Sequence, residues 1–155
     1  MTATNHALTG AIIGLTIDKP LLAIPLAFLS HFVCDAIPHF KFAGDFDNVA
    51  KSSKFARYLI IEAFLCFLIV LGLYLKQPFH WQVAAICAFL ATSPDFMWIR
   101  KFISARHNKK FHETLFDKFA SKIQWFQRPI GAVVEIVWFG AALTVYFILI
   151  GLVKF

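Results

Sequence analysis

Histidine and aspartate side chains occur within apolar runs of this chain, where ionisable groups are costly and are functional candidates by default. His31 and Asp35 lie four residues apart, a spacing that puts both on one face of a helix. Asp35 and His39 repeat the spacing if the helix persists to Pro38. Imidazole and carboxylate ligands suit zinc or another divalent first-row metal. The pattern therefore predicts a metal site, with zinc as the expected ion.

Other segments supply side chains of the same two kinds. One histidine opens the first apolar run, one aspartate lies near the end of another, and one histidine lies in a basic segment. The charge pattern of the loops, given below, puts all of them near the same leaflet. The expected metal ligands are His6, His31, Asp35, His39, Asp95 and His112.

Two glutamates are candidates for a general base, which an unligated carboxylate near a metal-activated water can provide. Glu62 follows Arg57 by five residues and Glu135 follows Arg128 by seven. At 1.5 Å per residue, both lie within ~7–11 Å of the basic interface. Glu62 could instead pair with Arg57 or join two helices by a hydrogen bond.

Each ligand candidate also has a structural interpretation. Asp35 could help to end its helix, and Asp95, which follows Pro94, could cap a broken helix by accepting backbone N–H bonds. The remaining histidines could lie among headgroups or at the membrane interface: His6, His39 and His112.

The composition identifies the elements that must position these residues. Of the 155 residues, 59% are hydrophobic and 15% are charged, which argues against a soluble domain. The apolar runs predict an all-α fold, a polytopic membrane helical bundle of about five transmembrane helices in a single integral-membrane domain, 1–155. The expected helices, the first two of them short, are 4–17, 21–37, 56–75, 82–99 and 129–151.

The first expected helix covers only ~21 Å, so it either spans the bilayer as a short helix or is re-entrant. It contains a GxxxG motif, Gly10 and Gly14, which allows a neighbouring helix to approach its backbone closely.

Basic residues are distributed unevenly between the expected connections. The second connection, taken with Arg57 in the first turn of the next helix, holds four Lys and Arg residues and the fourth holds eight, whereas the first and third hold one each. This asymmetry predicts that the amino terminus and the second and fourth connections are cytoplasmic. The net charge of +6 is therefore a topology signal, and we expect no nucleic-acid partner.

The fourth connection has helical periodicity of its own. Its apolar side chains recur at the spacing of one helix face, and His112 falls within that apolar arc. We expect a cytoplasmic amphipathic helix lying at the membrane interface and defined by Phe111, Leu115, Phe119, Ile123 and Phe126.

Three short motifs carry a resemblance to a known family. His6 lies on a short opening helix, Ser93-Pro94-Asp95-Phe96 follows an apolar run, and His107 precedes His112 by five residues. In these features the chain resembles the bacterial membrane-bound metal-dependent hydrolases of the YdjM-like kind. Met97 stands where that family has a second aspartate. The resemblance implies a hydrolase that uses a divalent metal in the bacterial cytoplasmic (inner) membrane.

Three functions remain open from the sequence. The first is a metal-dependent membrane hydrolase that acts on a lipid or phosphoester substrate at the cytoplasmic leaflet, with membrane lipids as its partners. The second is a small cation or metal transporter, and the third is a non-catalytic membrane scaffold. The sequence leaves the oligomeric state undetermined.

Overall fold

The described part of the chain is helical, and three helices in it are long and apolar enough to cross a membrane. The computed structural model describes residues 1–40, 45–124, 128 and 130–151. The first long helix is α4 (Ser53–Lys76) and the third is α8 (Gly131–Leu149). The second runs without interruption through α5 (Trp81–Thr92), the 3₁₀ segment η1 (Ser93–Phe96) and α6 (Met97–Arg106). Only 17% of the apolar window of α4 is buried, as expected for a helix that faces lipid.

Two shorter helices precede these three. The helix α1 (Ala3–Thr16) has 14 residues and α2 (Pro20–Ala36) has 17, so they extend about 21 and 25 Å. Their bounds agree within one residue with the expected helices. Neither reaches the ~20 residues that a hydrocarbon core requires. Transmembrane length is thus shown for three of the five expected spans, and crossing by α1 and α2 stays a prediction.

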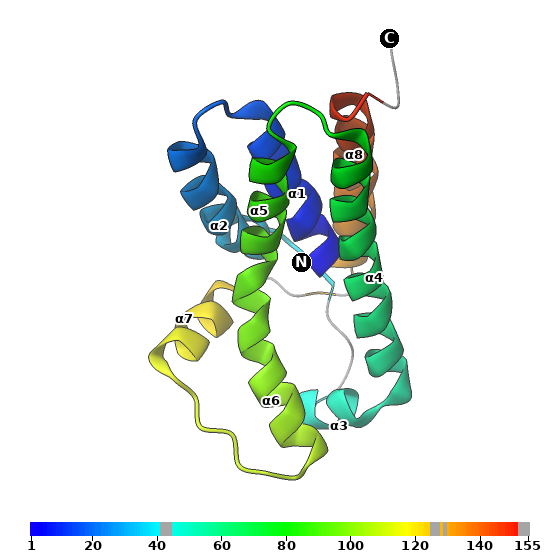
Figure 1. Cartoon of the computed structure of the whole chain (residues 1–155). Helices are drawn as coiled ribbons and strands as arrows, with labels where there is room; N and C mark the ends of the chain where they lie inside the picture. The colour runs from blue at the N-terminus through cyan, green and yellow to red at the C-terminus, as the bar shows by residue number, and fades with distance from the viewer. Residues whose placement is uncertain (41–44, 125–127, 129, 152–155) are drawn as a thin grey trace.

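Small residues bring α1 against α5 (Figure 1). A Cβ atom added at Gly10 would lie 2.3 Å from the carbonyl oxygen of Cys87. One added at Gly14 would lie 2.4 Å from the Cα of Ala84. These distances leave no space for any side chain, so the close approach that the GxxxG motif predicts is confirmed.

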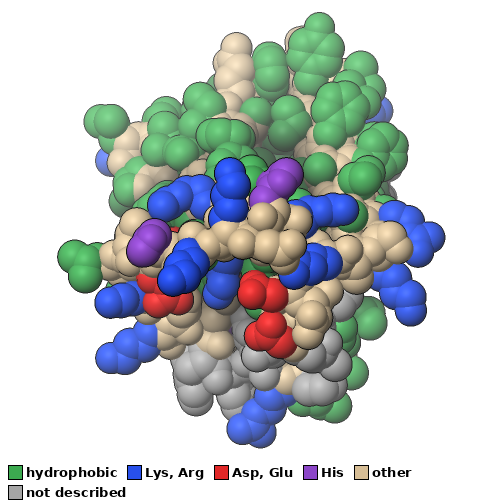
Figure 2. Space-filling model, turned by 90° about the horizontal axis from the view of Figure 1, so that it is seen from below, with side chains coloured by type: hydrophobic (Ala, Val, Ile, Leu, Met, Phe, Trp, Pro, Cys, Tyr) green, Lys and Arg blue, Asp and Glu red, His purple; other side chains and the backbone are tan. Residues whose placement is uncertain are grey.

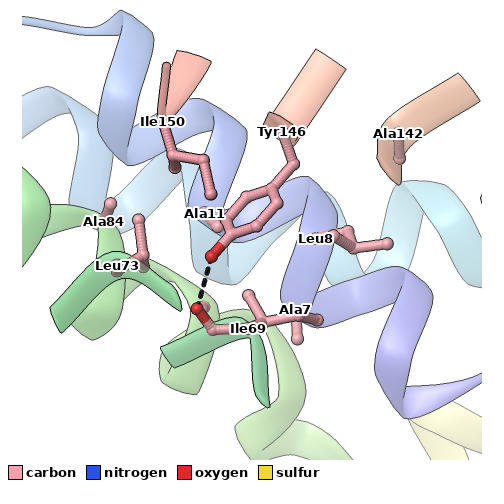
Figure 3. Packing of buried hydrophobic residues seen from close by; sticks show 10 residues of the cluster. Ala7, Leu8, Ala11, Ile69, Leu73, Ala84, Ala142, Tyr146 and Ile150 are labelled. Carbon is pink, nitrogen blue, oxygen red and sulfur yellow. Dashed lines mark hydrogen bonds between the residues drawn. The ribbon is translucent and has the colours of Figure 1, made fainter. Parts of the chain in front are cut away.

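A second contact joins α4 to α8 beside the same core. The Tyr146 hydroxyl donates a hydrogen bond of 2.5 Å to the carbonyl oxygen of Ile69, and Leu8 and Leu73 are fully buried around it (Figure 3). Most other residues of this cluster are alanines, which let the helices pack closely.

The segment after Thr92 continues as a helix beyond its expected end at residue 99. Pro94 has no backbone N–H, and the chain there winds as 3₁₀ helix before α6 carries it on to Arg106. Arg100 and Lys101, expected in a connection, therefore lie on α6.

A short helix that the sequence pattern did not predict, α3 (Phe46–Lys51), lies between α2 and α4. Asp45 caps it by accepting a hydrogen bond from the backbone N–H of Asp47. Its six residues are too few for a recognisable apolar period.

The amphipathic helix of the fourth connection is shorter than expected. It is α7 (Leu115–Ile123), and it begins with a capping box in which Thr114 and Asp117 satisfy each other's backbone N–H groups. Its apolar residues Leu115 and Phe119 are exposed, which suits contact with lipid. Phe126 lies outside the described residues.

His112 precedes α7 in a non-helical segment and is exposed. The expectation that it lies in the apolar arc of a helix is therefore wrong. The capping box starts the helix three residues after His112, so no helix positions this side chain.

The end of the molecule that carries α3, α6 and α7 is strongly basic. Figure 2 shows Lys and Arg side chains gathered across this face. They belong to the two connections that the loop charges assign to the cytoplasm, and the sidedness itself stays a prediction.

Candidate metal centre

Three helical segments bring His6, His31 and Asp95 together at the end of the bundle where α1 begins and where α2 and α5 end. One ligand atom of each residue lies within 4.8 Å of the others. His6 lies in the first turns of α1, His31 in the last turns of α2, and Asp95 in the 3₁₀ segment. Side chains from three separate parts of the sequence thus converge on one point.

Asp35 joins this cluster through both carboxylate oxygens. Its Oδ1 lies 3.2 Å from Nε2 of His6, and its Oδ2 lies 3.3 Å from Nε2 of His31. The imidazole rings of His6 and His31 stack with their centroids 4.0 Å apart. Four of the six predicted ligands therefore lie in one group, in which Asp95 alone is partly exposed, and the HxxxD spacing does place His31 and Asp35 on one face.

Asp35 also receives hydrogen bonds from two groups that sequence reasoning missed. The amino group of Met1 contacts Oδ1, and Gln124 Nε2 donates to Oδ2 at 3.0 Å. Gln124 is the C-cap of α7, so Asp35 connects this helix to α1 and α2. A lone glutamine after an amphipathic helix carries no sequence signal for such a role.

A hydrogen bond to the backbone of α5, on the side of the ring away from the carboxylates, fixes the orientation of His31. Its Nδ1 lies 2.8 Å from the carbonyl oxygen of Ala91. A carbonyl can only accept, so Nδ1 carries a proton, and Nε2 faces the carboxylates of Asp35 and Asp95. Nε2 lies 3.9 Å from Asp95 Oδ1. A backbone carbonyl behind a histidine is the usual outer support of a metal ligand.

The residues present fit a divalent metal. Two imidazoles and one or two carboxylates are ligand types that zinc accepts. His6 is fully buried, and its Nδ1 has no hydrogen-bond partner within the described chain. A buried polar nitrogen without a partner is costly, and in the described part of the chain only the side chains of Asn5 and His39 have another buried polar atom without one. His6, His31 and Asp95 would hold the ion, with Asp35 beside them.

Glu62 supports the start of α1 and also borders a cavity. Its Oε2 accepts hydrogen bonds from the backbone N–H and hydroxyl of Thr4, at 2.8 and 2.7 Å. The carboxylate thereby satisfies one of the free N–H groups of the first turn. Glu62 and Asp95 both line a cavity of about 230 Å³. The aromatic residues around it are Phe46, Phe55, Tyr58, Trp98 and Phe102.

Glu135 lies in a second cavity, of about 340 Å³, which Glu62 also lines. The backbone carbonyl of Glu135 accepts a hydrogen bond of 3.2 Å from the side chain of Asn5. Asp95 is absent from the lining of this cavity, and Glu135 is absent from the lining of the cavity that contains Asp95. Glu62 therefore shares a cavity with a candidate ligand, and it also borders the cavity of Glu135.

Two predicted ligands do not join the cluster. His39 is buried, and its Nδ1 donates to the carbonyl oxygen of Ile37 at 2.9 Å, while burial lowers the pKa of its imidazole. It lies after the end of α2, because that helix stops at Ala36, before Pro38. His112 is exposed on the segment before α7. The structure gathers His6, His31, Asp35 and Asp95, and leaves these two apart.

The geometry of this centre has to be interpreted from the chain itself. A search of protein-family models, of curated proteins and of solved structures finds no match to this chain.

Proposed function

We propose that the protein is a metal-dependent hydrolase of the bacterial cytoplasmic membrane that acts on a lipid or phosphoester. The observation that carries the proposal is the convergence of His6, His31 and Asp95 beside a cavity that Glu62 also lines. Metal-assisted hydrolysis requires metal ligands, a carboxylate near the metal and space for a substrate, and this site has residues suited to each.

Each side chain of the site has a different role in this proposal. A divalent metal, zinc by preference, would supply a Lewis acid and lower the pKa of a bound water. His6, His31 and Asp95 would hold it, and Asp95 also lines the cavity. Asp35 orients His6 and His31 through its two oxygens. Glu62 engages Thr4 through Oε2, which leaves Oε1 to take a proton at the cavity wall. Glu135 is the second candidate for the base.

The position and lining of the cavity favour a lipid substrate. Asp95 lies five residues before Arg100, so the cluster is about 8 Å from the basic end of the molecule. The aromatic walls of the cavity suit an apolar chain or an ester near the interface. With the amino terminus cytoplasmic, this level corresponds to the cytoplasmic leaflet.

One observation favours a non-catalytic scaffold as the second candidate. Met1, His6, His31 and Gln124 surround the two oxygens of Asp35, and together they could join the helices without any metal. In that case the cluster would contribute only to stability. A metal transporter would use the same ligands without hydrolysis.

Hydrolysis tests the proposal directly. The full chain is purified in detergent, reconstituted in vesicles of phosphatidylglycerol and phosphatidate, and assayed for release of phosphate and headgroup with Zn²⁺, with Mn²⁺ and with a chelator. We expect metal-dependent release that Asp95→Asn abolishes and that His107→Ala, at an exposed histidine, leaves unchanged. Metal binding without release from either lipid would favour the transporter, and release that survives chelation would contradict the proposal.

A further inference from the structure

A third cavity, with different chemistry, lies at the basic end of the protein. It has a volume of about 350 Å³ and lies between α3, α6 and the turn that follows α6. None of its residues belongs to the metal centre. The charged residues that line it are Asp47, Lys51, Lys101, Lys109 and Lys110.

The four lysines of this cavity have no ion-pair partner in the described part of the chain. In the described chain, no carboxylate lies within 4.0 Å of their ammonium groups. Lys51 Nζ donates instead to the neutral side-chain oxygen of Asn108, at 2.6 Å. Lys101 Nζ lies over the rings of Phe46 and Trp98, 4.9 and 5.2 Å from their centroids. Both interactions hold an ammonium group in place and neither neutralises it.

The local backbone fixes the position of the other two lysines. Asn108 has a left-handed conformation, with φ of 52°, and it ends α6 in a tight turn. The N–H of Lys109 then donates to the carbonyl oxygen of Ser104 at 2.9 Å. Lys109 and Lys110 are thereby held at the cavity rim although both are exposed.

The charge of this cavity is unbalanced. One aspartate offsets one of the four lysines, and the carboxyl ends of α3 and α6 contribute roughly half a negative charge each. An excess of about two positive charges remains, which raises the free energy of the empty cavity and favours a compact anion with two charges.

We propose that this cavity binds a phosphate group, either inorganic phosphate or the phosphomonoester headgroup of a lipid. Phosphate carries close to two negative charges at neutral pH and offers oxygens that accept from several ammonium groups at once. The inference goes beyond the proposed hydrolysis, because it concerns a cavity that the metal centre does not share.

Titration calorimetry on the full chain in a non-ionic detergent tests this site. The probes are inorganic phosphate and dihexanoyl phosphatidate below its micelle concentration, at constant ionic strength. The site variant is Lys109→Gln with Lys110→Gln. The matched control is Lys118→Gln with Lys122→Gln, which removes the same charge from α7, outside the cavity.

We expect saturable phosphate binding whose Kd rises at least tenfold in the site variant, changes less than twofold in the control, and recovers when both rim lysines are arginine. An equal loss in the two variants, or no saturable binding by the wild-type chain, would overturn the site. Tenfold tighter binding of the lipid than of phosphate assigns the headgroup as ligand, and equal affinity assigns free phosphate. Asp95→Asn should leave this binding intact, so the outcome is separate from that of the hydrolysis assay.

Discussion

His31 and Ala91 are joined by a hydrogen bond of 2.8 Å from the imidazole Nδ1 to the backbone carbonyl oxygen. The bond crosses from α2 to α5, requires a proton on Nδ1 and fixes the rotation of the ring. As a result, Nε2 of His31 points to the carboxylates of Asp35 and Asp95. The backbone of α5 thereby determines which nitrogen the protein offers to a metal.

The first prediction concerns metal content. The purified chain should contain about one divalent metal per molecule, and His31→Ala or Asp95→Asn should reduce the bound metal at least tenfold, because each removes a ligand. Inductively coupled plasma mass spectrometry after size-exclusion chromatography measures this. The exposed His107 and His112 provide His→Ala controls, which should keep the metal. Metal-free wild-type protein whose stability is unchanged by the two ligand variants would refute the centre.

The second prediction separates the two roles of Glu62. Glu62→Gln keeps an oxygen for the hydrogen bonds from Thr4 but cannot take a proton, so the rate should fall about 100-fold or more with little change in thermal stability. Thr4→Val removes the hydroxyl donor and should reduce stability by about 1 kcal/mol with a smaller effect on rate. The paired measurements are kcat and Tm. If the Tm of Glu62→Gln falls so far that the loss of folded protein explains the whole loss of rate, Glu62 has only a structural role.

The third prediction tests the contact between α1 and α5. Gly10→Ala should destabilise the protein by roughly 1–3 kcal/mol, since the new Cβ would overlap the backbone of Cys87. Gly140→Ala is the control: nothing lies within 4 Å of a Cβ there, and alanine in a helix interior should be neutral or stabilising by up to about 1 kcal/mol. Thermal unfolding in detergent compares the two, and similar Tm values for both variants would contradict the packing.

The fourth prediction concerns acid. The backbone N–H of Thr114 holds the pKa of the Asp117 carboxyl below its ordinary value of 3.8. Because the folded pKa is the lower one, the carboxylate stabilises the start of α7 fully above 3.8, and this contribution disappears as the pH falls through the folded pKa. Hydrogen exchange of the α7 amides should therefore show lost protection in strong acid, and Asp117→Asn should remove the pH dependence. Glu113→Gln, at an exposed neighbour, should retain it.

The fifth prediction concerns the bond between Tyr146 and Ile69. Tyr146→Phe removes the hydroxyl donor and should cost about 1 kcal/mol in unfolding free energy. Tyr74→Phe, on the exposed side of α4, should change stability less. Denaturant titration in mixed micelles gives both values, and an equal loss would show that the buried bond contributes nothing specific.

The sequence predicted the long helices well because their apolar runs are long and uniform. It also predicted that His6, His31, Asp35 and Asp95 share one level. Depth follows from residue spacing along a helix, and the loop charges give its reference. Metal binding by these residues stays a prediction.

The parts that the sequence did not predict depend on local backbone bonds or on contacts between distant residues. Thr114 and Asp117 start α7 by a capping box, and this leaves His112 exposed before the helix. Pro38 separates His39 from the end of α2. Gln124 reaches Asp35 only because α7 packs against α2, which no spacing rule indicates.

The 3₁₀ segment Ser93–Phe96 rotates the faces of α6 about the helix axis relative to those of α5. Four residues wound at about 120° each, instead of about 100°, advance the helix surface by roughly 80°. The side that α5 turns to α1 is therefore different from the side that α6 turns to α3. One continuous helix thus packs against α1 and α3 with different faces, and Asp95 lies in the 3₁₀ segment where the face changes. If this segment relaxed into ordinary α-helix, α6 would rotate about the helix axis, and Asp95, within the segment itself, would turn away from His31.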